Sequence, residues 1–557
     1  MKNTKRARRA AAFAAAVVMA ACAAVPMGSS FSASAEGNNS ITITAVDGAD
    51  ITHSYEAYQV FKGQYAAGSL GNIDWGTGVD GDAILAELQS AAAPLDVFNG
   101  AKNAKDVAEI LAANATEQQD DTLAVAFAAV VGKHLTAVKS GTYANGAITG
   151  LDDGYYLVQD ASDSPSGTGE TNSGAKTRFI LKVAGGNVTV TAKSSAPSVV
   201  KKVKENTDVS DYVYTDANGE KTDADYNDVA DYNIGDAVPF KLYGTMPDTI
   251  DDYSKYKYVF HDTLSKQFDA PAAENVSVKI DGTDAVDVNV NVDSTTNTIT
   301  VTFDDIKAKN KITKSSIVTV EYNAVLNSDA VIGLDGQENK VYLTYSNNPN
   351  WTGTGTETPD DKGKTPEDKV IVFTYELDVT KYLDNEQTPA NATDGTKAGF
   401  KLSNADGKWA TVENMKITGW VDSEDKATQV ETAADGTFKF IGLDDGTYTL
   451  SETTTPTGYN TMADLTLTID ATTANNQAWS GTASDALSAI KLTINKVDTA
   501  GDTSTGIVAT KIINQKGSNL PSTGGIGTTM FYVGGGVLVA GAGVLLITKK
   551  RAKKDAE

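Results

Sequence analysis

The stretch YTLSE, residues 448–452, decides how this 557-residue sequence folds. Side chains in a β-strand alternate between two faces, so Tyr448, Leu450 and Glu452 share one face. The two apolar side chains mark that face as the one that turns to a core, and Glu452 turns with them. A buried carboxyl group is costly unless it is protonated or has a partner. The stretch therefore predicts a half-buried antiparallel strand with an acid inside the core.

The same alternation of apolar and polar residues continues through most of the chain from Pro197 onward. Short strands at regular spacing, with turn residues between them, predict immunoglobulin-like sandwiches. The polar stretch NNPNWTGTGTETPDDKGKTPEDK, residues 347–369, divides this region into a middle block (197–369) and a C-terminal block (370–516). Clear examples of the alternation are VDVNVNV (286–292), TITVTF (298–303), GTFKFIGL (436–443) and LTLTID (465–470).

The N-terminal block, residues 36–196, has a different pattern. Its strand-like runs, among them ITITAVD (41–47) and RFILKVA (178–184), enclose segments with apolar residues at helical spacing. Two of these helical segments are AKDVAEILAA (104–113) and DTLAVAFAAVVGKHLTAVK (121–139). The pattern predicts an α+β domain ahead of two mainly-β domains.

The start of the sequence predicts export. Residues 1–35 combine five basic residues, an apolar run and the A-x-A site Ala33-Ser34-Ala35, which together are typical of a secretory signal peptide. We expect the mature protein to start near Glu36.

The end of the sequence predicts attachment to a membrane. Residues 517–557 contain LPSTG at 520–524, an uncharged apolar segment at 526–548 and a basic tail at 549–557. The apolar segment is long enough to cross a hydrocarbon core of about 30 Å. The basic tail should stay in the cytoplasm by the positive-inside rule. We therefore expect a transmembrane span that holds the exported protein at the membrane.

The exported part is strongly acidic and has no cysteine. Removal of residues 1–35 and 524–557 takes 10 of the 47 basic and 2 of the 72 acidic residues, which leaves 37 and 70 and a net charge of −33. Such a surface repels nucleic acid and favours a well-solvated extracellular protein. Cys22 is the only cysteine and lies in the signal peptide, so a disulfide cannot stabilise the exported chain.

The sequence contains no recognisable cofactor site. His53, His134 and His261 lie far apart without the spacing of metal ligands, and neither a phosphate loop nor a catalytic-triad signature is present. We expect no cofactor, no metal and no enzymatic turnover.

Three polar residues of the C-terminal block fall on apolar strand faces. Lys381 shares a face with Leu377 and Val379, Asn514 shares one with Ile512, and Glu452 is the acid of the opening stretch. In an apolar pocket, desolvation lowers the pKa of an amine and raises that of an acid, so both can be neutral. The neutral amine can then attack the asparagine carbonyl while the acid moves protons. The triple predicts an isopeptide bond that joins the first strand to the last.

YTLSETTTPTGY, residues 448–459, resembles the E-box of sortase-assembled major (backbone) pilins of Gram-positive bacteria, Y-x-L-x-E-T-x-A-P-x-G-Y, with Thr455 in place of alanine. The C-terminal block then resembles a collagen-adhesin B-type domain. The resemblance implies that Lys381 is the bond-forming lysine, Glu452 the catalytic acid and Asn514 the asparagine.

The middle block resembles the isopeptide-forming middle domain of the same pilins at PSVVKKV (197–203) and VYLTYSNNP (341–349), among other places. The resemblance implies roles for Lys201 as the amine, Asp262 as the acid and Asn347 as the amide. Strand parity supports Lys201 and Asn347, while the neighbours Lys202 and Asn348 stay open as alternatives. In the N-terminal block the opening strand has no lysine, so Asp160 lacks an obvious partner and we expect no internal bond there.

The stretch Leu520-Pro521-Ser522-Thr523-Gly524 resembles a sortase sorting signal. The resemblance implies cleavage between Thr523 and Gly524 and transfer of the Thr523 acyl group to an amine, while the span keeps the substrate beside the enzyme. The pilin motif of the family has a weak counterpart in VTVTAK, residues 188–193, so Lys193 is the expected amine. Lys201, Lys202 and Lys204 are close enough to compete.

The sequence thus predicts the major structural subunit of a covalent pilus, or fimbria, on the cell wall. The expected partners are sortase, other copies of the chain and peptidoglycan, with a tip pilin and a host-surface ligand as further candidates. The alternative is a monomeric wall-anchored adhesin. Each internal bond would release one ammonia molecule, so we expect two such losses, abolished separately by Glu452→Ala and Asp262→Ala.

Overall fold

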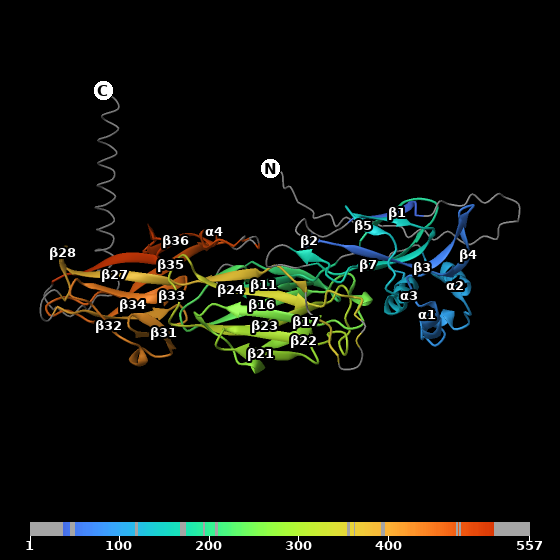
Figure 1. Cartoon of the computed structure of the whole chain (residues 1–557). Coiled ribbons are helices and arrows are strands. Elements are labelled where there is room, and N and C mark those ends of the chain that lie inside the picture. The colour runs from blue at the N-terminus through green and yellow to red at the C-terminus, as the bar shows by residue number, and fades with distance from the viewer. Residues whose placement is uncertain are drawn as a thin grey trace, which may run out of the picture.

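Three parts of the chain follow one another along an elongated molecule (Figure 1). The N-terminal block with its helices lies at one end, the middle block at the centre and the C-terminal block at the other end. Among the residues described below, no helix is long and apolar enough to cross a membrane. A computed structural model describes residues 37–44, 51–116, 121–167, 174–192, 195–206, 210–351, 353, 357–360, 363–391, 396–474, 477, 479 and 481–516.

The N-terminal block combines two four-stranded sheets with three helices, as the sequence predicts. One sheet has the order β10-β1-β6-β5 and the other β4-β3-β7-β9, and β2 (Ile51–Thr52) pairs separately with β8 (Ser166–Gly167). The helices α1 (Gly81–Leu88), α2 (Ala104–Asn114) and α3 (Thr122–Lys133) bury their apolar residues against the second sheet. The strands are β1 (Asn39–Thr44), β3 (Tyr55–Ala66), β4 (Ser69–Trp75), β5 (Thr142–Ala144), β6 (Ala147–Leu151), β7 (Gly154–Asp160), β9 (Arg178–Val183) and β10 (Val188–Thr191).

Each helix of this block starts at a side-chain cap. Asp80, Asn103 and Asp121 accept hydrogen bonds from the backbone N–H groups of Ala83, Asp106 and Ala124. Such caps satisfy donors that the first helical turn leaves unpaired, and they fix where each helix begins.

The middle block is a sandwich of two seven-stranded sheets around one apolar core. The alternation predicted this arrangement, because each strand turns one face to the core. The first sheet contains β11 (Val199–Lys204), β14 (Tyr226–Asn227), β16 (Ala237–Thr245), β18 (Phe268–Asp269), β19 (Ser277–Ile280), β20 (Thr283–Asp284) and β23 (Ile317–Leu326). The second contains β15 (Val229–Asp231), β17 (Tyr258–Leu264), β21 (Asn289–Asp293), β22 (Thr298–Phe303), β24 (Gln337–Tyr345), β25 (Gly363–Lys364) and β26 (Asp368–Phe373). A hairpin of β12 (Tyr212–Asp216) and β13 (Gly219–Asp223) is separate.

The junction between the middle and C-terminal blocks differs from the sequence expectation. The polar stretch 347–369 leads into β26, which pairs with β24 and so still belongs to a middle sheet. Val370 and Val372 of β26 join the middle core, whereas Ile371 and Phe373 join the next core. The composition indicated a polar stretch between the two blocks, but the pairing of β26 with β24 extends the middle sheet beyond that stretch. The division of the chain into domains at our expected bounds therefore stays a proposal.

The C-terminal block is built on a twelve-stranded sheet that folds around its own core. Its first strand, β27 (Tyr375–Leu383), pairs in parallel with its last, β38 (Ile507–Asn514). The opening stretch of the sequence lies in β34 (Gly446–Thr454). The other strands are β28 (Asn385–Pro389), β29 (Gly399–Asn404), β30 (Trp409–Glu413), β31 (Lys416–Val421), β32 (Val430–Glu431), β33 (Thr437–Leu443), β35 (Leu465–Thr473), β36 (Leu487–Ile494) and β37 (Val497–Ala500), with the short helix α4 (Ala483–Ala486) before β36.

Candidate functional site

Lys381, Glu452 and Asn514 meet inside the C-terminal block. Lys381 comes from β27, Asn514 ends the adjacent strand β38, and Glu452 comes from β34. The register pairs Leu383 with Asn514, two residues beyond Lys381, so the lysine and asparagine side chains lie on the same face of neighbouring strands. All three residues are buried, as the strand alternation predicts.

The three side chains form one hydrogen-bonded chain. Lys381 Nζ donates to Asn514 Oδ1 at 2.6 Å, and Asn514 Nδ2 donates to Glu452 Oε1 at 2.7 Å. Lys381 Nζ lies 3.5 Å from the same Glu452 oxygen, and the backbone N–H of Met462 holds the other oxygen, Oε2, at 2.7 Å. The amine therefore lies against the carboxamide it would attack, with the acid in contact with both.

The surroundings favour an uncharged amine. Burial lowers the pKa of Lys381 to about 8, although the nearby Glu452 opposes the shift. The amine also lies 5.3 Å from the centre of the Phe400 ring. A larger fraction of neutral amine makes Lys381 a better nucleophile at physiological pH.

A second buried lysine meets an acid in the middle block. Lys201 Nζ on β11 donates to both carboxylate oxygens of Asp262 on β17, at 2.6 and 2.7 Å. The hydroxyl of Tyr322 on β23 accepts from Lys201 Nζ at 2.9 Å and donates to Asp262 Oδ2 at 2.5 Å. Burial lowers the pKa of Lys201 to about 8 and raises the pKa of Asp262, and each group opposes the shift of the other.

The amide that the resemblance assigned to this site does not reach it. Asn347 lies beyond the end of β24, where its Nδ2 donates to the backbone oxygen of Gly174 at 3.3 Å. The buried amide beside Lys201 belongs instead to Asn339, whose Nδ2 donates to the Tyr322 hydroxyl at 2.9 Å. Asn339 Oδ1 is buried without a hydrogen-bond partner among the described residues.

Sequence parity could have found Asn339, because it shares a strand face with Val341, Leu343 and Tyr345. Parity alone could not separate it from Asn347, which continues the same alternation. The register of β17 against β24 separates the two asparagines. Leu264 pairs with Asn339 only two residues from Asp262, and Tyr258 pairs with Tyr345 at the far end of β17.

The two open alternatives have other contacts. Lys202 points to the opposite face of β11 and pairs with the carboxylate of Asp228, under the ring of Tyr212. Asn348 caps a turn, where its Oδ1 accepts the backbone N–H of Asn350 at 3.0 Å.

Asp160 in the N-terminal block has partners that the sequence did not indicate. Its Oδ1 lies 2.7 Å from His53 Nδ1 and 2.6 Å from Ser164 Oγ, while its Oδ2 accepts the backbone N–H of Thr177 at 2.6 Å. No described lysine pairs with it. The histidine comes from a distant position in the sequence, so strand parity gave no sign of it.

The predicted signal peptide at 1–35, Lys193, the LPSTG stretch at 520–524 and the apolar segment at 526–548 lie outside the described residues.

Family models match three separate parts of the chain. Residues 234–349 match "Gram-positive pilin backbone subunit 2, Cna-B-like domain", residues 389–482 match "Prealbumin-like fold domain", and residues 512–555 match "LPXTG cell wall anchor motif". The first two ranges cover parts of the two sandwich blocks, and the third covers the predicted sorting signal.

Among curated proteins, the chain is similar to the trypsin-resistant surface T6 protein of Streptococcus pyogenes serotype M6, at 25% identity over 283 residues. The match covers 42% of this chain and spans about half, 48%, of that relative. Among solved structures, the T6 backbone pilin of the same organism aligns with 87% of this chain and 100% of its own at 18% identity and a TM-score of 0.48. The major pilin SpaD of Corynebacterium diphtheriae aligns with 86% of this chain and 98% of its own, at 18% identity and a TM-score of 0.43.

The anchor motif and the pilin-type sandwich together define a surface protein of the Gram-positive cell wall. Within that class, residues 234–349 of the middle sandwich are of the backbone-pilin domain type.

Proposed function

We propose that the chain is the repeating subunit of a sortase-assembled pilus and that it strengthens itself with two internal isopeptide bonds. The observation that carries the second part is the contact at 2.6 Å between Lys381 Nζ and the Asn514 carboxamide, with Glu452 in contact with both. A pilus shaft bears tension, and a covalent bond between the first and last strands of a sandwich prevents the strands from separating under load.

The reaction balances without a cofactor. The neutral Lys381 amine attacks Asn514 Cγ, and a proton passed from Glu452 to the carboxamide oxygen stabilises the tetrahedral intermediate. Glu452 then takes a proton from the former amine, delivers it to the leaving nitrogen, and takes back its first proton from the oxygen as the carbonyl group forms again. The Cγ–Nδ2 bond breaks, ammonia leaves, and Nζ and Cγ form the amide. The acid ends as it began, so the reaction runs once for each chain.

In the middle block we propose the same reaction between Lys201 and Asn339. Asp262 would move the protons, and the Tyr322 hydroxyl, which contacts all three of these side chains, would hold the amide near the amine. The unpartnered Asn339 Oδ1 is the atom on which negative charge develops, and a proton from Asp262 would neutralise it.

Subunits would be joined by a different enzyme-catalysed bond. Sortase would cleave after Thr523 and transfer its acyl group to a lysine of the next copy, for which Lys193 is the candidate, or finally to peptidoglycan. The anchor match over 512–555 supports this processing. Attachment to a host ligand and to a tip pilin belongs to the same proposal.

The polymer is tested by expression in a sortase-containing Gram-positive host. Polymerisation predicts a ladder of species that resist heat and detergent, and Lys193→Ala should collapse it to a single band. Lys202→Ala is the matched control, because Lys202 is buried against Asp228 and is therefore not accessible to sortase. A single band from the unaltered chain, with attachment that depends on a host ligand, would favour a monomeric adhesin instead.

A further inference from the structure

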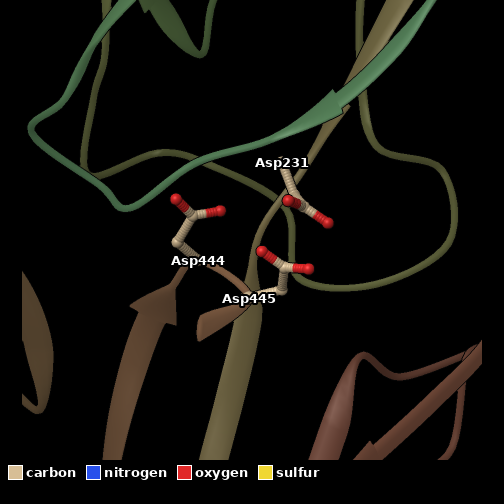
Figure 2. Close-up of side chains that lie close together, drawn as sticks. All are labelled: Asp231, Asp444 and Asp445. Atoms are coloured by element: carbon tan, nitrogen blue, oxygen red, sulfur yellow. The ribbon is translucent and has the colours of Figure 1, made fainter. Parts of the chain in front are cut away.

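Three aspartates from two blocks of the chain face one another at the junction between the middle and C-terminal sandwiches (Figure 2). Asp231 ends β15, which pairs with β26 in the middle block. Asp444 and Asp445 form the turn between β33 and β34 in the C-terminal block. One carboxylate oxygen from each lies within 4.8 Å of the others. We call these residues the junction acids.

In two of the junction acids, one carboxylate oxygen accepts a hydrogen bond and the other does not. The Tyr375 hydroxyl donates to Asp231 Oδ2 at 2.7 Å, and Asn206 Nδ2 donates to Asp444 Oδ2 at 2.7 Å. The remaining oxygens, Asp231 Oδ1 and Asp444 Oδ1, are buried without a hydrogen-bond partner among the described residues. The two residues are only 2% and 5% exposed. This is how outer-shell donors orient ligands around a cation, with one oxygen fixed and the other free to bind.

The carboxylates at the junction also concentrate negative charge. Glu205, whose Oε2 accepts the Asp231 backbone N–H at 3.0 Å, adds a fourth carboxylate. No described lysine or arginine pairs with Asp231 or Asp444. So much buried negative charge must be neutralised, either by shared protons or by a bound cation.

A turn with the same sequence provides an internal comparison. Leu-Asp-Asp-Gly recurs at 151–154 in the N-terminal block. There, Asp152 Oδ1 accepts the backbone N–H of Gly37 at 2.8 Å, and Asp153 Oδ1 accepts from Asn39 Nδ2 and Gly185 N at 3.0 and 2.8 Å. Donors of the chain itself satisfy those acids. At the junction, Asp444 Oδ1 has no hydrogen-bond partner among the described residues, and the turn lies against the carboxylate of Asp231.

We propose that the junction acids bind one Ca²⁺ ion, which fastens the middle block to the C-terminal block. Ca²⁺ prefers carboxylate oxygens at about 2.3–2.6 Å, so two ligands on opposite sides of it lie at most about 5 Å apart, which accommodates the spacing of these oxygens. Mg²⁺ needs shorter bonds in strict octahedral geometry and fits less well. The site is independent of the isopeptide chemistry and would stiffen the junction whether or not either internal bond forms.

The sequence alone predicted no metal, because Asp231 lies more than 200 residues from its partners and because every acid of the cluster occurs in an ordinary strand end or turn. Only the packing of β15 against the β33–β34 turn brings the ligands together.

The test uses the exported chain after treatment with a chelator. Tb³⁺, a Ca²⁺ substitute excited through nearby tyrosines, should emit when added, since Tyr375 contacts Asp231 directly. Added Ca²⁺ should displace it with a stoichiometry of one per chain, and calorimetry with Ca²⁺ alone should give the same stoichiometry and raise the unfolding temperature. Absence of both sensitised emission and Ca²⁺ heat in the unaltered chain overturns the proposal, as does binding of Mg²⁺ at least as tight as that of Ca²⁺.

Variants locate the ion. Asp445→Asn should weaken Ca²⁺ binding at least tenfold, and this half-buried residue is the ligand that tolerates substitution best. Asp152→Asn, in the matching turn of the N-terminal block, should leave Ca²⁺ affinity unchanged. Equal affinities for the two variants would place the ion elsewhere and refute the assignment. The ammonia losses of the internal bonds should be intact in both variants, so failure of the Ca²⁺ site and failure of the crosslinks are separable.

Discussion

Replacement of Glu452 by glutamine tests the proton-shuttle role of this acid. Glutamine at this position keeps the size of the side chain and its ability to hydrogen-bond, but it cannot exchange protons with the Lys381 amine. We expect Glu452→Gln to abolish the bond between Lys381 and Asn514 and to leave the bond in the middle block intact. The intact mass should then be higher by about 17 Da, one ammonia molecule, than that of a doubly crosslinked chain after correction for the substitution.

The structure also sets the size of the effect on stability. Lys381 and Asn514 are 133 positions apart, so the crosslink closes a loop whose entropy corresponds to about 5 kcal/mol. For a block of this length, that free energy corresponds to a fall of roughly 15 °C in the unfolding temperature. Scanning calorimetry of the exported chain measures the fall in the transition of its C-terminal block.

The matched control is Glu376→Gln. Glu376 lies on β27, the strand of Lys381, and is shielded from solvent as Glu452 is, but it pairs with Lys439 at 2.6 Å, away from the isopeptide site. This variant should lose two ammonia molecules, as we expect of the unaltered chain. If Glu452→Gln also lost two, the acid would not be needed and the proposed mechanism would be wrong.

Three further outcomes follow from the two lysine sites. In mass spectra, Asn339→Ala should lack the ammonia loss of the middle block, and Asn347→Ala should retain it. The reverse result would show that Asn347, the residue implied by the resemblance, forms the bond. Tyr322→Phe should slow crosslinking during refolding, measured as mass against time, because the hydroxyl contacts both Lys201 and Asp262; an unchanged rate would show that the hydroxyl has no role. In Asn514→Ala the Lys381 amine stays uncrosslinked, with a folded pKa of about 8 against an ordinary value of 10.5. Between these two pH values the unfolded state binds more protons than the folded state, so the free energy of unfolding should rise with pH there. Denaturant titrations should show a rise of about 3 kcal/mol. The same chain with Lys381→Met added should lack this rise, and equal pH profiles would mean that the amine titrates normally in the fold.

The sequence was sufficient to predict the C-terminal site because its members lie on regular strands. Lys381, Glu452 and Asn514 each follow apolar neighbours at a spacing of two, and that periodicity alone turns each side chain inward. The joining of the first strand to the last could be expected from the sandwich fold. The helical segments of the N-terminal block were equally clear, since their apolar residues recur at helical spacing.

Features that depend on pairing between distant strands could not be predicted in the same way. Asn339 and Asn347 have the same parity, and only the register of β17 against β24 separates them. His53 reaches Asp160 through the packing of a loop that has no periodicity. The polar stretch 347–369 looked like a linker because composition carries no information about the pairing of β26 with β24.

The amine chemistry depends on burial as well as position. A pKa of about 8 gives Lys381 roughly 300 times more neutral amine at pH 7 than an ordinary lysine has. A solvent-exposed lysine at the same distance from an asparagine would rarely be neutral, which is why a close contact on a protein surface does not lead to a bond.

The most direct test of the account is sequencing of proteolytic peptides from the unaltered chain by tandem mass spectrometry. We expect two branched peptides, one that joins Lys381 to Asn514 and one that joins Lys201 to Asn339, each lighter than the sum of its linear parts by one ammonia molecule. Linear peptides with free lysine at both positions would contradict it.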